Sequence, residues 1–342
     1  MKFRVRRFGL RAFGAFFLAG MVSGMLTGRV AAQTCTTQSQ MKPAERDALA
    51  GAATSLAQKI AANDQAGLKA ATIPEFQKDF AGIAGVVSSI SPGLQGARAN
   101  VEQVYVLDAS SLTGTASDAQ FECSLNQSQA GASFSIPQLP PGRYGFAMVR
   151  MEKPMPYRLS FLLRQQGSQW QLAGLYPKPL TAGGHDGLWY WKEARGLKAQ
   201  KQDWNAWLYL QEAQVLLQPA GFVSSSHLDK LQTELTEAAP PEAASLSSDA
   251  PLVLKAADGT EYRFTSIATD DSLGKEKVEV AAHLKVDALG DAVTARKRNV
   301  DAMTALVAAH PELRKAFQGV WIFADAPGGN PYATEQAMSE IH

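Results

Sequence analysis

The residues best suited to chemistry are a histidine and an aspartate that stand side by side, His185 and Asp186, in the stretch GGHDGLWYW. A histidine can act as a general base near neutral pH when a partner orients it, so His185 is the one candidate for a catalytic residue. Trp189, Trp191 and the later Trp204 could line a cleft beside it. We take these five residues as the candidate binding residues and assign no catalytic residue beyond the candidate His185.

The same stretch also has a purely structural interpretation. Asp186 precedes a long run without proline, and aspartate is a favoured helix N-cap because its carboxylate accepts backbone N–H groups that lack partners. Its charge suits the positive end of a helix dipole. Gly183 and Gly184 then supply the bend before the helix, and the tryptophans that follow belong to a hydrophobic core.

Other chemical motifs are not evident. The five histidines are dispersed and no two stand at metal-ligand spacing, so we expect neither a metal nor a cofactor. The sequence contains no glycine-flanked nucleophilic serine, no phosphate-binding glycine-rich loop and no dinucleotide fingerprint. The serine run at 224–226 before His227 fits a helix N-cap better than a nucleophile and its base.

Cys35 and Cys123 are the only cysteines in the chain. In an oxidising compartment they are a reasonable disulfide pair, and two free thiols are the alternative. Closing so long a loop would stabilise the fold by about 4 kcal/mol in the chain-entropy model.

Residues 1–32 have the pattern of an export signal. A basic start runs from Lys2 to Arg11, an apolar stretch follows to about Leu26, and small residues end at Ala32. The apolar stretch is shorter than the roughly 20 residues of a membrane span, so a retained anchor is the less favoured alternative. We expect a signal peptide over 1–32 and a mature chain that is periplasmic or extracellular and does not span the membrane.

Charge restricts the class of partner. Residues 1–32 contain six basic and no acidic residues, which leaves 27 basic and 32 acidic residues and a net charge of about −5. This balance speaks against nucleic acid, whose binding needs a basic face. An unknown protein, peptide or small ligand remains as the partner.

The mature part is longer than a usual single core, which predicts more than one domain. Residues 41–182 begin with amphipathic helices over about 42–62 and 72–90, the second with Phe76, Phe80, Ile83 and Val87 on one face. Short strand-like segments follow. Helices followed by an antiparallel meander form an α+β pattern, and this region resembles the curved sheets on helices of cystatin-like and nuclear transport factor-like folds.

A helical region is expected over 183–235. Its run LWYWKEARGLKAQKQDWNAWLYLQEAQVLL is similar to one tetratricopeptide-type hairpin over 187–219, with Ala194 and Ala206 where the two helices would touch. Glu193 departs from that pattern, which usually has leucine there. Because a single copy cannot stack into a solenoid, we expect the hairpin to pack on the N-terminal domain.

The rest of the chain divides into a linker and a second domain. Residues 236–250 are rich in Ala, Pro, Ser and Glu, which predicts a linker. Residues 251–342 predict a second small α+β domain. It would have a hairpin with a type I′ turn at Asp258–Gly259, a further strand, an amphipathic helix and a closing strand.

The run GGHDG-WYW, the segment DWNAW and the C-terminal HPELR-F-GVW are together similar to exported bacterial proteins of unknown function. This resemblance implies export and brings no activity. With clear domain signals and no catalytic motif, we expect an exported, soluble, non-catalytic binding or scaffold protein. The alternative is a hydrolase-like enzyme that uses His185 in an aromatic-lined cleft.

We predict that the exported protein starts near Gln33 and contains a Cys35–Cys123 disulfide, because the signal ends there and the oxidising compartment favours the bond. Intact mass under non-reducing conditions, before and after alkylation, measures both features. Two alkylatable thiols in native exported material would contradict the prediction.

Overall fold

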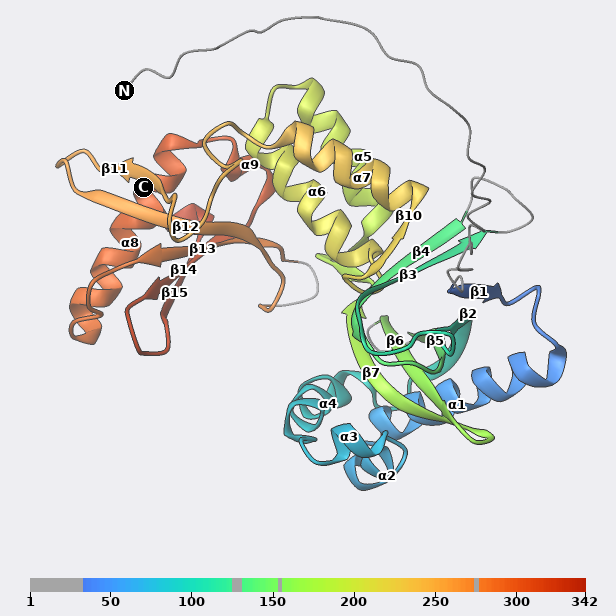
Figure 1. The fold of residues 1–342 in the computed structure, drawn as a ribbon. Helices are drawn as coiled ribbons and strands as arrows, with labels where there is room; N and C mark the ends of the chain where they lie inside the picture. Colours follow the sequence, from blue (N-terminus) through green and yellow to red (C-terminus); the bar gives the residue numbers. More distant parts are fainter. Residues whose placement is uncertain (1–32, 125–130, 153–155, 274–276) are drawn as a thin grey trace, which may run out of the picture. The chain divides into compact units, whose positions relative to one another are not determined.

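The computed structural model describes residues 33–124, 131–152, 156–273 and 277–342, so the expected signal peptide over 1–32 lies outside the described residues. Helices combine with mostly antiparallel sheets, without a closed barrel, which confirms the α+β class (Figure 1). No helix in the described part of the chain has the length and apolar character needed to cross a membrane.

A five-stranded antiparallel sheet organises the N-terminal part of the chain. Its order is β1 (Thr34–Thr37), β2 (Arg98–Asp108), β5 (Arg143–Glu152), β6 (Tyr157–Gln166) and β7 (Gln169–Pro179). One face is covered by α1 (Pro43–Ala61), α2 (Gln65–Ala70) and α4 (Ala81–Leu94), and the short α3 (Pro74–Gln77) connects α2 to α4 (Figure 1). Leu49, Ile60 and Val87 from these helices form one hydrophobic cluster with Val104 and Phe161 of the sheet.

The second amphipathic helix differs from its prediction. The helix breaks between Gln77 and Ala81, so that α3 and α4 have separate phases. Val87 is fully buried, but Phe76 is 44% exposed and no longer shares a face with it. Helical periodicity assumes an unbroken helix, and the break invalidates the face assigned to Phe76.

The other face of this sheet, which we call the cavity face, carries Tyr105, Phe146 and Met148. A small sheet covers part of it, with the order β10 (Val223–Ser225), β4 (Gly131–Leu139) and β3 (Ala116–Ser124). Phe134 of β4 and Phe222 contact the Phe146 ring edge-to-face, at centroid distances of 5.1 and 5.7 Å. The predicted Cys35–Cys123 disulfide is confirmed and joins β1 to β3.

The remaining elements form a second group. They are β8 (Thr181–Ala182), β9 (His185–Asp186), α5 (Gly187–Ala199), α6 (Asp203–Leu217), α7 (Ser226–Ala238), β11 (Leu252–Lys255), β12 (Glu261–Asp270), β13 (Glu279–Lys285), α8 (Ala292–Ala309), α9 (Leu313–Ala316), β14 (Gly319–Asp325), β15 (Tyr332–Ala337) and a 3₁₀ turn (Met338–Glu340). The C-terminal sheet has the order β11-β12-β13-β14-β15, with β13 and β14 parallel and α8 between them in the chain.

Packing on the N-terminal domain accounts for only part of the contacts of the α5–α6 hairpin. Its buried Tyr190, Trp204 and Leu208 belong to one hydrophobic cluster with side chains of the C-terminal sheet, including Phe264 and Val280. The hairpin also contacts the N-terminal sheet, where Arg158 of β6 donates to the Leu217 carbonyl at 3.4 Å. The domain boundaries themselves stay predictions.

Two C-terminal details go beyond what composition indicated. Within the segment expected to be a linker, Ala243 is buried and Glu242 accepts a hydrogen bond from Trp204 Nε1 at 3.1 Å. The hairpin turn between β11 and β12 is present, but only Gly259 has a positive φ, +87°, so the turn is not the expected type I′. Asp258 instead accepts the Thr260 N–H at 2.9 Å, and this bond stabilises a longer loop.

The buried carboxyl of Glu212 in α6 should make the stability of the fold depend on pH. It is 6% exposed and accepts a hydrogen bond from the Thr269 hydroxyl of β12, and its burial raises the pKa of the carboxyl. An acid with a raised pKa binds more protons in the folded state, so its contribution to stability falls as pH rises past its ordinary pKa. We expect Glu212→Gln to gain stability relative to the parent as the pH rises from about 4.5, the ordinary pKa of a glutamate, upward. Urea unfolding of both proteins across this range measures the difference, and a constant difference would contradict it.

Candidate functional site

The GGHD stretch is a tight hairpin that leads into a helix. Thr181–Ala182 pair with His185–Asp186, and the two glycines between them have φ of +53° and +81°. Both positions favour glycine, because a side chain is strained at such φ values. Asp186 caps α5 by accepting the Trp189 N–H at 2.8 Å, which confirms its role as an N-cap.

His185 lies exposed at this hairpin. Its ring stacks on Trp189, with centroids 3.7 Å apart and planes 9° apart. His185 does not line either of the two mainly apolar cavities described below. The structure therefore brings His185, Asp186 and Trp189 together. Among the described residues, no acidic or basic side chain forms a hydrogen bond with the His185 imidazole.

Trp204 has a different environment. It is 3% exposed, contacts Trp207 edge-to-face at 5.4 Å and lies 4.3 Å from the buried His310 ring. Burial lowers the pKa of His310, which favours its neutral form. Trp204 thus packs in the core, and of the five predicted binding residues only Trp191 lines a large cavity.

That cavity, which we call cavity 1, has a volume of about 510 Å³. The cavity face of the five-stranded sheet forms one wall, and the ends of α5, α6 and α7 with β10 form the others. Its walls are mainly apolar and include Tyr105, Phe146, Met148, Leu188, Trp191, Leu217, Pro219 and Val223. Leu188 is 62% exposed at α5.

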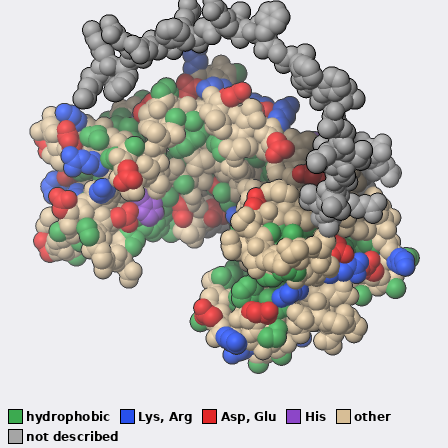
Figure 2. Space-filling model, viewed as in Figure 1, with side chains coloured by type: hydrophobic (Ala, Val, Ile, Leu, Met, Phe, Trp, Pro, Cys, Tyr) green, Lys and Arg blue, Asp and Glu red, His purple; other side chains and the backbone are tan. Residues whose placement is uncertain are grey.

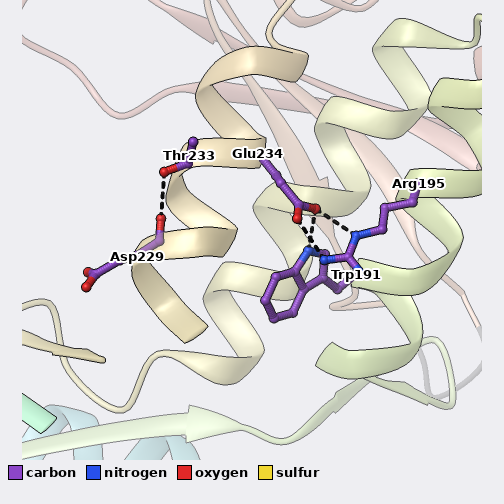
Figure 3. A network of polar contacts seen from close by, with 5 residues as sticks. All are labelled: Trp191, Arg195, Asp229, Thr233 and Glu234. Carbon is purple, nitrogen blue, oxygen red and sulfur yellow. Dashed lines mark hydrogen bonds and ion pairs between the residues drawn. The ribbon is translucent and has the colours of Figure 1, made fainter. Parts of the chain in front are cut away.

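Trp191 is held in place by a polar network between α5 and α7 (Figure 3). Its indole Nε1 donates to Glu234 at 2.7 Å, and Arg195 donates to both oxygens of the same carboxylate at 2.8 and 2.7 Å. The Arg195 guanidinium also lies 4.8 Å from the centre of the Trp191 ring. These hydrogen bonds lower the pKa of Glu234 and fix the aromatic wall of cavity 1.

Sequence reasoning missed the strand residues of cavity 1. Phe146 and Met148 alternate along β5 with Ala147 and Val149, which face the helices. A strand that is apolar on both faces must be covered on both sides, and this pattern in GFAMVRM was the available signal. Burial also raises the pKa of the Tyr105 phenol in the same wall.

Three charged residues meet at the edge of this wall. Arg150 of β5 and Arg158 of β6 are directly opposite each other, and both approach Glu102 of β2, at 3.7 and 3.2 Å. Glu102 lies at a β-bulge, where the β2–β5 register shifts between Val101 and Gln103. Arg158 lines cavity 1 and also donates to the Leu217 carbonyl at 3.4 Å.

The serine run beside cavity 1 serves the backbone. Ser225 caps α7 by accepting the Leu228 N–H at 3.3 Å, and the Ser224 hydroxyl bonds to the Asp229 carboxylate. His227 next to them is exposed. This arrangement agrees with the expectation of a helix N-cap.

A second cavity of about 850 Å³, cavity 2, lies beside the first on the same face and shares Val223 and Ser224 with it. Its charged groups, Arg164 and Glu75, pair with each other at 3.2 Å. Phe76, exposed by the break before α4, lies in its lining.

The comparisons add no identity: no family model, no curated protein and no solved structure matches the chain. Within the described residues, no group of three His, Cys, Asp or Glu side chains could hold a metal ion.

Lys and Arg side chains are interspersed with Asp and Glu on the face seen in Figure 2.

We predict different losses in the free energy of unfolding for three substitutions in and beside α5. Asp186→Ala should lower the free energy of unfolding by about 1 kcal/mol through the lost cap. Trp191→Ala should lower it by about 3 kcal/mol, since the ring is 8% exposed. His185→Ala, at an exposed ring, should change it by less than about 0.5 kcal/mol. Urea melts measure all three, and a Trp191→Ala protein within about 1 kcal/mol of the parent would show that the ring serves binding alone.

Proposed function

We propose that this is an exported, non-catalytic protein that binds a small, mostly apolar ligand in cavity 1. The observation that carries the proposal is a cavity of about 510 Å³ with aromatic and aliphatic walls contributed by segments from β1 to α7. Ligand sites of proteins have this size and apolar character, with a few convergent polar groups. The Cys35–Cys123 disulfide supports an oxidising, exported location.

Binding fits the lining better than catalysis does. Ser225 is occupied as a helix cap, Ser224 bonds to Asp229, and Arg158 is paired with Glu102. His185, the candidate for catalysis, lies at the exposed β8–β9 hairpin and not in the lining of cavity 1. The walls instead supply apolar surface, whose burial contributes roughly 25 cal/mol per Å².

We predict that the protein binds the neutral fluorescent probe N-phenyl-1-naphthylamine and that Ala132→Phe weakens this binding at least about tenfold, or ~1.4 kcal/mol. Ala132 is half-buried in the lining of cavity 1, so a phenyl group there would occupy the ligand volume. Fluorescence titration of the purified chain, with unfolding curves to confirm the fold, measures the effect.

Ala173→Phe is the matched control, because Ala173 is a half-buried strand alanine that lines cavity 2 instead. Probe affinity should be unchanged in this variant. Weakened binding in Ala173→Phe alone would move the site to cavity 2, and no binding to the unaltered protein would refute the proposed function.

A further inference from the structure

We infer that the ligand of cavity 1 is an amphiphile with one oxyanion head group, a carboxylate or a phosphate, and that Arg158 binds this head group. The inference rests on the proposed function of cavity 1 and specifies the chemical class of its ligand. It follows from the charges around the cavity, from the geometry of Arg158 and from the apolar walls.

The permanent charge among the side chains that line cavity 1 is positive. Among the described residues that line cavity 1, Arg158 is the one permanently charged side chain, and no aspartate or glutamate lines it. The acids that contact lining residues have partners: Glu234 bonds to Trp191 and Arg195, and Asp229 bonds to Ser224.

The cluster that holds Arg158 has an excess positive charge. Arg150 and Arg158 are directly opposite on neighbouring strands, a placement that like charges disfavour. The bulge brings the Glu102 carboxylate between them, but one carboxylate neutralises only one of two guanidinium groups. Arg158 is only 16% exposed, so water screens the charges of this cluster weakly at the cavity.

Arg158 also has a free donor. Its Nε bonds to Glu102 and its Nη1 bonds weakly to the Leu217 carbonyl, while its Nη2 has no hydrogen-bond partner among the described residues. A guanidinium fork matches the two oxygens of a carboxylate or phosphate. An oxyanion could therefore take up Nη2 and replace the long bond to Leu217.

The other walls suit an apolar tail. The walls also include Phe146, Met148 and Trp191, whose apolar surface offers no hydrogen bond to a charged oxyanion except the indole N–H, which is already bonded to Glu234. A ligand that combines a chain of methylene groups with one oxyanion would match both parts of the cavity, each methylene adding apolar burial.

The test displaces N-phenyl-1-naphthylamine from the purified chain with four ligands of equal chain length: decanoate, decyl phosphate, 1-decanol and decylammonium. We expect at least one anion to displace the probe at a concentration about tenfold or more below that of decanol, with decylammonium weakest. The two anions distinguish a carboxylate from a phosphate head group. This comparison uses the unaltered protein and requires no substitution to fold.

Arg158→Gln should remove the advantage of the anions over decanol, measured as the ratio of their displacement concentrations in the same variant. Arg150→Gln is the matched control, since it removes the same charge from the same cluster at a side chain that does not line cavity 1. It should keep most of the anion advantage.

The outcomes separate the two proposals. Equal displacement by decanol and both anions would overturn the oxyanion inference and leave the cavity function standing. An anion advantage lost equally in both variants would overturn the direct contact with Arg158. Failure of the unaltered protein to bind the probe would overturn the cavity function and, with it, this inference.

Discussion

A sheet that is apolar on both faces must exclude water from both, and β5 imposes this condition on the N-terminal part of the molecule. Ala147 and Val149 meet the helices α1 and α4, whereas Phe146 and Met148 face the other way. The small sheet of β3, β4 and β10 covers the cavity face around an aromatic cluster of Phe134, Phe146 and Phe222. The small sheet does not cover the whole face, and cavities 1 and 2 lie in the apolar surface that remains beside it.

Trp191 shows how one side chain can serve both packing and a binding wall. Its ring lies in the hydrophobic cluster of the hairpin and also in the lining of cavity 1. Glu234 fixes the indole nitrogen and Arg195 covers the ring, so α5 and α7 are held together at the edge of the cavity. A wall with a fixed rotamer loses less conformational entropy when a ligand binds.

The arginine pair on β5 and β6 is costly for stability alone. Two facing guanidinium groups repel, and the bulge at Glu102 relieves this repulsion only in part. Arg158 has both kinds of neighbour, because it pairs with Glu102 and also lines an apolar cavity.

Local interactions explain what was predicted correctly from the sequence. The Asp186 cap, the helices of the 187–217 hairpin and the serine cap of α7 depend on hydrogen bonds and periodicity within a few residues. With only two cysteines, one disulfide pairing was available. The same local reasoning failed at the break before α4 and at the Asp258–Gly259 turn, where tertiary packing and loop hydrogen bonds override propensity.

The sequence by itself determined the α+β class, most of the elements and the caps of α5 and α7, because each follows from near neighbours along the chain. Only the tertiary structure decided where the candidate site lies. Cavity 1 depends on strand register, on the bulge at Glu102 and on the approach of α5 and α7 to the cavity face. Arg158 acquires its role from neighbours 56 and 59 residues away, Glu102 and Leu217, and no local pattern encodes such contacts.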